Sequence, residues 1–433
     1  MSLIHPWGPI RISVRTTDVV RPVLQHLYAS RHDFTAPIII HANTFTSKDS
    51  MEKSVDPIIF IETVQKLLPE ATISLGWTPS SNYAALNRLD WSKTFRLMSY
   101  LSDLRQPVML TMNLNDVLHS LEQLEWLLGI NEPEIFLLVK ADATAFVDAD
   151  FQKLSAISEN DKILFDVDDG WRRKLRHLEP KPPKKRRRSV EPEKWKNRIF
   201  PSSHSMLSTN IISKTGIAFL GWPNALLLSN NEIQNYPSKQ SISGKIMFHP
   251  KRQLREITPL RDSGMLVQFF EKNLLTIDSP KIDDSVTVLI GFDGRITISN
   301  NLRRSDPLYY ESSSGQLPKS PCYEFKIIDK GWKIDAEVWT SPCHSGMKDH
   351  SQKLISSSSS NPENEIPIYR TFLSLDTPIS RNRKLRNIGI SKSGDGAIDF
   401  LLQELEHSDA ASIQNLSVFC VLFSIVFTFI LRV

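Results

Sequence analysis

The sequence lacks the signatures of several common kinds of functional site. It contains three cysteines in 433 residues, and no cysteine and histidine spacing typical of a zinc site occurs. A glycine-rich phosphate loop and the serine elbow of hydrolases are absent as well. The N-terminus has no basic start followed by an unbroken apolar core, so it does not match a signal peptide. We therefore expect no metal site and no cofactor.

Positive charge is concentrated in one segment, although the net charge is only +4. Residues 171–200 hold thirteen Lys or Arg against three Glu, so the rest sums to about −6 and is not a nucleic-acid binder by charge. The run KKRRR at 184–188 fits a nuclear signal, a processing site, or a solvated loop that binds acidic glycans or anionic lipid. We favour the solvated loop, because a nuclear signal conflicts with the apolar tail.

One long apolar run occurs, at the C-terminus. Residues 416–431, LSVFCVLFSIVFTFIL, carry no charge, and a helix of this length reaches about 24 Å, short of the ~30 Å hydrocarbon core. Small residues and a polar spacer precede it, which is the layout of a GPI-attachment signal, with Ser408 as the expected lipid attachment residue. A short membrane-spanning tail is the alternative. Cys420 lies in this run, which leaves Cys322 and Cys343 as a potential pair in an oxidising compartment.

The first 170 residues repeat a β-branched run followed by a helical pattern. The runs are apolar throughout, as buried parallel strands are. We expect strands at residues 10–14, 37–40, 72–75, 108–112, 135–139 and 163–167. Six βα steps imply a parallel sheet covered by helices. They fit an open doubly wound sheet and most of an eight-unit barrel equally well.

The pattern changes after residue 170. Residues 171–205 are basic and Pro-rich and are expected to be an exposed linker or loop. In residues 206–344, short β-like runs separated by turns such as GFDGR and DKG predict a β-rich domain of sandwich type. The Ser-rich residues 345–397 are expected to be largely disordered. Residues 398–415 are expected to be a stalk or GPI spacer before the hydrophobic tail, residues 416–433.

Five segments of the first half carry a family resemblance: APIIIHANTF, FIETVQKLLPEATISLGWTP, LSDLRQPVMLTMNLND, LEWLLG and ILFDVDD. In order and spacing they resemble the menorin family, over about residues 10–169. The most specific element is P…T-x-S-L-G-W-T. The β-rich region and the tail are similar to the C-terminal part of longer, cell-surface members. The family domain is a variant of the phosphodiesterase-type barrel, so the resemblance implies a TIM-type (βα) barrel for residues 1–170.

The resemblance also implies that part of the barrel is missing. Family barrels begin with two further βα units, which carry a histidine-asparagine element, an acidic pair and a second histidine. Nothing before Ile10 supplies them, so we expect an incomplete barrel of six units whose first two are absent. The missing signal peptide fits the same explanation. The family's third strand tends to carry an acidic residue, where Ser13 stands here.

Polar side chains follow the expected strands, at the end where barrels carry their functional loops. We expect a ligand-binding site at the barrel mouth formed by His41, Asn43, Trp77, Asn113, Lys140, Asp142 and Asp166. Gly76 would let the backbone turn, and Trp77 either lines the mouth or plugs the barrel end. Phosphodiester cleavage needs an acid, a base and usually a metal held by carboxylates. His41 is the one histidine in this set, so we expect no catalytic pair.

These observations predict a cell-surface or extracellular binding protein rather than an enzyme. The resemblance implies adhesion proteins as partners, in complexes that guide neurite (dendrite) branching, with the membrane reached through the tail. Two alternatives stay open. One is a phosphodiesterase-like barrel enzyme acting on lipid or phosphodiester substrates, and the other is a tail-anchored cytosolic protein. We expect no nucleic-acid partner.

Overall fold

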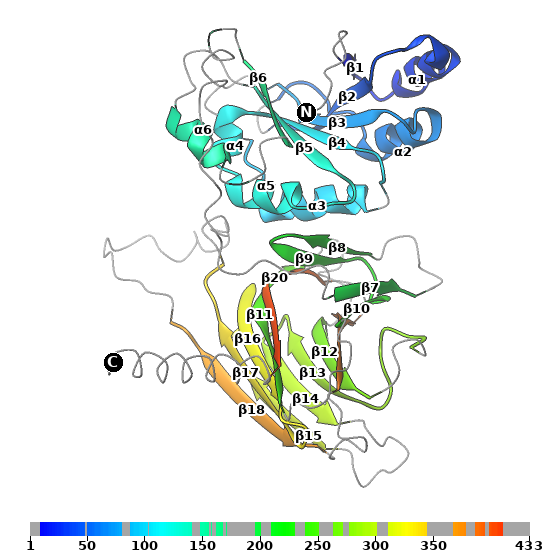
Figure 1. Cartoon of the computed structure of the whole chain (residues 1–433). Coiled ribbons are helices and arrows are strands. Elements are labelled where there is room, and N and C mark those ends of the chain that lie inside the picture. The colour runs from blue at the N-terminus through cyan, green and yellow to red at the C-terminus, as the bar shows by residue number, and fades with distance from the viewer. Residues whose placement is uncertain are drawn as a thin grey trace, which may run out of the picture. The chain divides into compact units, whose positions relative to one another are not determined.

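The computed structural model divides the chain into two compact units, residues 1–187 and 188–433 (Figure 1). The structure describes residues 9–47, 50–79, 87–102, 104–140, 148–155, 157, 162–167, 170, 195–200, 209–229, 239–250, 263–271, 277–300, 311–343, 367–377, 386–394 and 398–409.

The first unit is built on a six-stranded parallel sheet. Its strands are β1 (Ile10–Val14), β2 (Ile38–Phe45), β3 (Thr72–Trp77), β4 (Val108–Asn113), β5 (Ile135–Lys140) and β6 (Ile163–Asp166). They lie in the order β1-β2-β3-β4-β5-β6, without the reversal that marks a doubly wound sheet. The expected partial (βα) barrel is therefore confirmed, and the doubly wound alternative is wrong.

Helices follow the strands and cover the sheet (Figure 1). They are α1 (Val20–Ala29), the 3-10 turn η1 (Arg31–Asp33), α2 (Pro57–Leu67), α3 (Trp91–Leu101), α4 (Leu114–Leu118), α5 (Leu121–Leu128) and α6 (Asp148–Ser155). The start of α2 is fixed by Asp56, whose carboxylate accepts hydrogen bonds from the N–H groups of Ile58 and Ile59. Phe60 and Val64 are fully buried on this helix, and each such side chain contributes about 1.5–3 kcal/mol.

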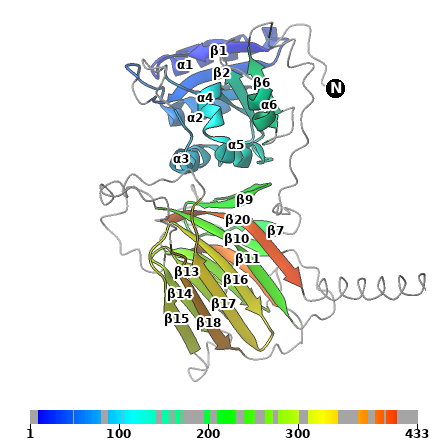
Figure 2. The same ribbon diagram turned by 90° about the vertical axis from the view of Figure 1, so that its left-hand side faces the viewer.

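The second unit is a β-sandwich-like pair of seven-stranded antiparallel sheets (Figure 2). One sheet has the order β15-β14-β13-β12-β19-β10-β7 and the other β18-β17-β16-β11-β20-β9-β8. The strands are β7 (Trp195–Ile199), β8 (Thr209–Ser213), β9 (Gly216–Leu220), β10 (Ala225–Ser229), β11 (Gln240–Pro250), β12 (Gly264–Phe270), β13 (Ser285–Gly291), β14 (Arg295–Asn300), β15 (Glu311–Gln316), β16 (Cys322–Asp329), β17 (Lys333–Thr340), β18 (Arg370–Asp376), β19 (Asn387–Ser393) and β20 (Ile398–Asp409). The expected sandwich-type domain is confirmed.

An aromatic cluster fills part of the core of this unit. The rings of Phe219 and Phe400 stack with centroids 4.5 Å apart. Phe248 meets Phe400 and Tyr323 edge-on, each at 6.0 Å. These residues come from β9, β11, β16 and β20, so strands far apart in the sequence share one core.

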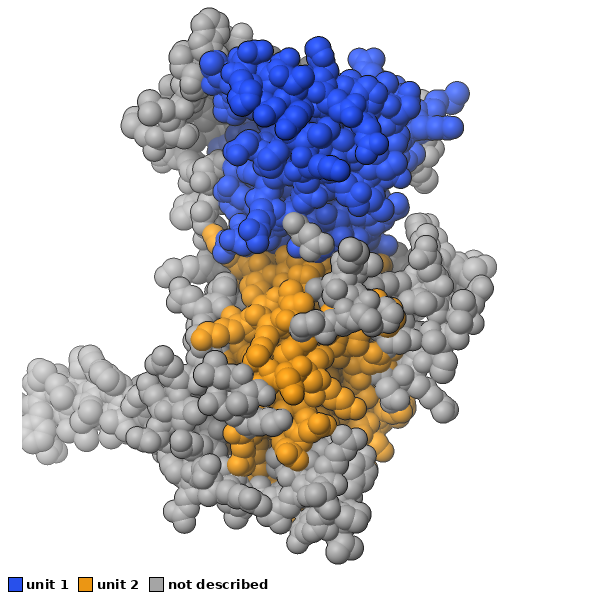
Figure 3. Space-filling model, turned by 90° about the vertical axis from the view of Figure 1, so that its right-hand side faces the viewer, with its two compact units in different colours: residues 1–187 blue, residues 188–433 orange. Residues whose placement is uncertain are grey.

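The expected boundaries of the β-rich domain are wrong at both ends. Strands β18 and β19 lie inside residues 345–397, which were expected to be largely disordered, and β20 occupies most of the expected stalk, residues 398–415. Strand β7 likewise lies inside the expected linker, residues 171–205. The second unit accordingly takes in residues 188–433 (Figure 3). These strands carry no helix-like period and pair with strands distant in the sequence, so local composition hides them.

The last two strands occupy the middle of the sandwich. Strand β19 pairs with β12 and β10 in one sheet, and β20 pairs with β11 and β9 in the other. Between them a buried ion pair joins Lys392 to Asp399, with Nζ and Oδ1 2.7 Å apart. Both side chains also bind the backbone of Gly221, Lys392 at its carbonyl and Asp399 at its N–H. The ion pair therefore fixes the point where the chain passes from one sheet to the other.

Several of the sequence-based predictions fall on residues that the structure does not describe. These are the basic run at 184–188, Asp142 and the hydrophobic tail, residues 416–433. Across the part of the chain that is described, we find no helix with the length and apolarity needed to cross a membrane.

We predict that a chain ending at residue 397 loses the β unit, whereas a chain ending at residue 409 keeps it. Removing β20 leaves β11 and β9 without the strand between them and opens the core at Phe400 and Leu402. The shorter chain should lack the cooperative unfolding transition of the β unit in differential scanning calorimetry. The longer chain should match the full chain, and equal transitions for both truncations would contradict the central role of β20.

A disulfide joins Cys322, at the start of β16, to Cys343, just after β17, with a Cα–Cα distance of 5.5 Å. It links the open end of the β16–β17 hairpin, whose turn holds Gly331 at a φ of +82°. A Cys pair of this kind is typical of proteins of the secretory pathway.

We predict that replacing both cysteines, Cys322→Ser with Cys343→Ser, lowers the free energy of unfolding by about 3 kcal/mol. The bond closes a sequence separation of 21 residues, and opening it restores that loop entropy to the unfolded chain. Urea unfolding measures the loss. Dithiothreitol should produce the same loss in the native chain and none in the double variant, and two free thiols in secreted native protein would contradict the bond.

Candidate functional site

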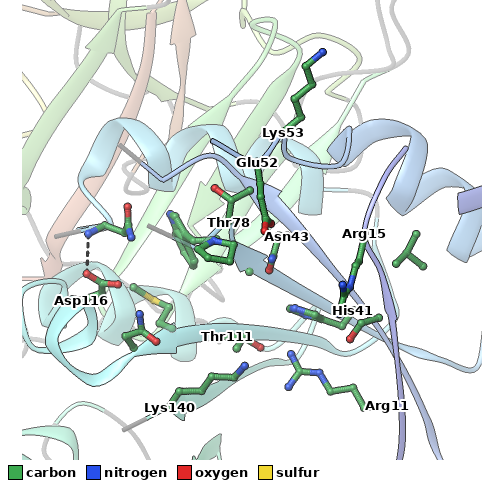
Figure 4. Close-up of a pocket in the computed structure, with 18 of the residues that line it drawn as sticks. Arg11, Arg15, His41, Asn43, Glu52, Lys53, Thr78, Thr111, Asp116 and Lys140 are labelled. Carbon is green, nitrogen blue, oxygen red and sulfur yellow. Dashed lines mark hydrogen bonds between the residues drawn. The ribbon is translucent and has the colours of Figure 1, made fainter. Parts of the chain in front are cut away.

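A cavity of about 710 Å³ opens at the carboxyl ends of the barrel strands (Figure 4). Five of the residues expected at the barrel mouth line it: His41 and Asn43 from β2, Trp77 from β3, Asn113 from β4 and Lys140 from β5. Parallel strands bring their carboxyl ends to one edge, which is why residues almost a hundred positions apart share one cavity. Ligand binding by these residues stays a prediction.

Asp166 takes a different place from the other expected residues. It ends β6 with an exposed side chain, opposite Lys140 in the strand register. Its carboxylate acts electrostatically on Arg11 of β1, although β1 and β6 are the two outer strands of the sheet. The sheet therefore curls enough for its edge strands to influence each other, as a partial barrel should.

His41 is the most altered titratable group of the cavity. Its Nδ1 lies 3.0 Å from the hydroxyl of Ser74, which lies 3.2 Å from the hydroxyl of Thr111. Burial, together with the positive charges of Arg11 and Lys140, lowers the pKa of His41 to about 4. The imidazole is therefore neutral at physiological pH.

Gly76 and Trp77 end β3 in a way that shapes the cavity. A Cβ on Gly76 would come within 2.8 Å of both Asn43 Oδ1 and His41 Cε1, so only glycine leaves room for these two side chains. Trp77 stacks on Phe45, with ring centroids 4.8 Å apart, and also lines the cavity. Trp77 is therefore half-buried between Phe45 and the cavity, and its part in ligand binding stays a prediction.

The sequence reasoning missed Arg11 of β1 and Arg15, the residue directly after this strand. Arg11, Ser13 and Arg15 all line the cavity, because alternate residues of a strand share one face. The stretch RISVR contains this signal in its alternating Arg11, Ser13 and Arg15, whereas the family resemblance points only to Ser13. Burial lowers the pKa of Arg11, and its buried Nε has no hydrogen-bond partner among the described residues.

The charges of the cavity are unevenly distributed. Arg11 and Lys140 point toward each other across the floor in Figure 4. Asp116 is buried and accepts a 2.7 Å hydrogen bond from the N–H of Asn87, and burial raises the pKa of this carboxyl group. Two cations facing each other beside a neutral imidazole disfavour a bound metal cation and favour an anion. Among the described residues, no three His, Cys, Asp or Glu side chains are grouped to hold a metal ion.

Two family models match the chain. The Menorin N-terminal domain matches residues 5–172, and the Menorin C-terminal domain matches residues 195–407. The chain belongs to the menorin family. The match to the C-terminal domain runs through β18, β19 and β20, in agreement with the corrected extent of the β unit.

Three known proteins illustrate what this menorin-family chain is similar to at low identity. Human Protein FAM151B is 28% identical over 120 residues, which are 28% of this chain and 44% of the human protein. Among solved structures, a legume lectin-like domain from Entamoeba histolytica is 13% identical, with a TM-score of 0.31, and covers 51% of this chain and 94% of that domain. An endo-β-1,3-glucanase from Pyrococcus furiosus is 10% identical, with a TM-score of 0.30, and the match covers 51% of this chain and 89% of the glucanase. Structural likeness this weak says nothing about function.

We predict that His41 of this menorin-family barrel makes stability depend on pH between about 4 and 6.5. The unfolded chain binds a proton at His41 below its ordinary pKa of 6.5, whereas the folded chain does so only below about 4. The contribution of His41 to the free energy of unfolding is therefore fully present above pH 6.5. It falls by about 2–3 kcal/mol as the pH drops to 4.

The measurement compares urea unfolding of the native chain and His41→Asn at pH 4–7. Asparagine keeps a polar group near Ser74 but does not titrate, so the difference between the two proteins should shrink toward acidic pH. An NMR titration of the His41 ring with a midpoint near 6.5 would contradict the prediction.

Proposed function

We propose that this menorin-family protein is a non-enzymatic binding protein of the cell surface or extracellular space, which acts with adhesion proteins in neurite (dendrite) patterning complexes. Family membership and the Cys322–Cys343 disulfide support this assignment. The disulfide weighs against the tail-anchored cytosolic alternative, because cytosolic thiols are kept reduced.

The observation that carries the proposal is the basic floor of the barrel cavity. The guanidinium of Arg11 and the ammonium of Lys140 face the same space, and within the described part of the chain the buried Nε of Arg11 has no partner. A carboxylate, sulfate or phosphate group would satisfy these donors, and charge-assisted hydrogen bonds of this kind are strong. The cavity therefore suits an acidic group presented by a protein or glycan partner.

The titratable groups of the cavity favour binding over acid–base catalysis. A general acid or base works best with a pKa near the working pH, whereas His41 is neutral with a pKa of about 4. The carboxylate of Asp116 is already engaged by the backbone of Asn87. The second candidate is a phosphodiesterase-like enzyme, which the same anion-binding floor favours, since a phosphodiester also carries negative charge.

Attachment to the membrane through the tail remains part of the proposal. Ser408, the expected lipid attachment residue, lies near the end of β20, and its hydroxyl is 2.7 Å from that of Ser241 on β11. A lipid attached to Ser408 would be joined directly to the end of β20, with no spacer between the sheet and the membrane. A GPI anchor and a spanning tail both stay open.

We predict that sulfate and phosphate bind the barrel cavity of the full chain and raise the pKa of His41. A bound anion offsets the charges of Arg11 and Lys140 that disfavour the imidazolium. NMR titration of His41 with increasing sulfate measures both effects. Arg11→Gln combined with Lys140→Met should weaken binding about tenfold or more. Lys66→Met, an exposed change on α2 that removes one positive charge, is the control for general charge effects.

Two outcomes would contradict this proposal. Equal weakening by Lys66→Met would show general screening rather than a site. Turnover of bis(p-nitrophenyl) phosphate with Mg²⁺ or Ca²⁺, abolished by His41→Asn, would establish the enzyme instead of the binding protein.

A further inference from the structure

A second, smaller cavity lies on the β unit, on the sheet face turned away from the core. Its volume is about 230 Å³, and β11, β16, β17 and β20 contribute to it. The alternation along β16 identifies the two faces of the sheet. Phe325 and Ile327 lie in the core, whereas Glu324 and Lys326 lie on the opposite, outward face. The cavity belongs entirely to the β unit and is independent of the barrel.

A β-bulge creates the hollow. Ser243 of β11 pairs with Glu406 and Lys245 pairs with Gln403, so β20 carries one extra residue at this point. The bulge holds Glu404 at a φ of +51°, a left-handed conformation that non-glycine residues rarely adopt. Opposite the bulge, a Cβ on Gly244 would come within 3.1 Å of the Phe325 ring.

The strained residue is exposed and carries a carboxylate that lines the cavity. Glycine would adopt the same backbone conformation without strain, yet Glu404 stands there. Backbone strain of this kind collects at ligand sites, where it aims a side chain. We read the bulge as the device that turns the Glu404 side chain into the hollow.

Trp339 forms an aromatic wall whose orientation is fixed. Its Nε1 donates a 3.1 Å hydrogen bond to Oε2 of Glu324. The other oxygen of Glu324 accepts a 2.6 Å hydrogen bond from the hydroxyl of Ser341 and lies 3.6 Å from Nζ of Lys245. The guanidinium of Arg370 lies over the indole, 5.6 Å from the ring centroid. The ring and the carboxylate are therefore held in place before any ligand arrives, which lowers the entropy lost on binding.

The mixed charge of the lining indicates which ligand it suits. Lys245 and Lys326 oppose Glu324, Glu404 and Glu406, so the cavity has no strong preference for an ion of either sign. It offers hydrogen-bond acceptors, donors and a flat apolar ring within one small space. Its volume lies below the ~300–1,000 Å³ of sites for drug-sized ligands, so a single ring fits.

We propose that this cavity binds a neutral saccharide, with one sugar ring against Trp339 and its hydroxyl groups hydrogen-bonded to the carboxylate of Glu404 and the ammonium of Lys245 or Lys326. A sugar ring has an apolar C–H face and a rim of paired hydroxyls, which match the indole and the charged rim. The site is separate from the anion-binding barrel cavity and does not depend on it.

The test uses the full chain and the methyl glycosides of glucose, galactose, mannose and N-acetylglucosamine. Saturation-transfer NMR should show that at least one binds, with a Kd of about 10 mM or tighter. Trp339→Ala should abolish this binding. Trp332→Ala is the matched control, because Trp332 is an exposed tryptophan in the β16–β17 turn that does not line the cavity.

A second variant separates binding from folding. Glu404→Gly relieves the positive φ, so it should raise the melting temperature by about 2–4 °C while weakening saccharide binding at least fivefold. A merely structural residue would not change stability and binding in opposite directions. Absence of binding by all four glycosides, equal loss in Trp332→Ala and Trp339→Ala, or unchanged affinity in Glu404→Gly would each overturn the proposal.

Discussion

The pairing of β20 between β11 and β9 is the interaction on which the β unit depends. Together with β19, which lies between β12 and β10, this strand joins two groups of strands in each sheet that otherwise share no neighbour. Phe400 and Leu402 on β20 then complete the core, and the buried pair of Lys392 and Asp399 holds the crossing. Breaking such a pair by removing one partner costs about 3–5 kcal/mol, because the other charge stays buried. Both sheets are thus complete only when residues 387–409 are in place.

The barrel unit depends on a different constraint, the convergence of parallel strand ends. Because β1 to β6 follow one another in sequence order, the residue at the end of each strand falls next to the end of its neighbour. Gly76 leaves space for His41 and Asn43, and the Ser74 and Thr111 hydroxyls link β2 to β3 and β4. The set of side chains that meet in this cavity is therefore determined by the strand order and by the absence of a Cβ at Gly76.

Sequence reasoning succeeded where the signal is local and failed where it is not. The parallel strands were predictable because each is an apolar run followed by a helix, and His41, Asn43 and Trp77 stand at strand ends. Strands β18 to β20 were missed, since their partners lie up to about 180 residues away and their flanks are Ser-rich and polar. Arg11 and Arg15 were missed although they alternate with Ser13 in the sequence. The family resemblance predicts an acidic residue at position 13, and the interpretation of this strand rested on that missing acid alone. The Glu404 bulge has no sequence signature, since it arises from the register between two strands.

The two cavities share a principle that links fold to function. Each lies where regular backbone is interrupted, at the Gly76 strand end in one unit and at the Glu404 bulge in the other. Their chemistry differs: Arg11 and Lys140 favour an anion, whereas the mixed lining beside Trp339 favours a neutral polyhydroxyl group. The two proposed sites therefore call for chemically different groups, and each can be tested without the other because each lies within one unit.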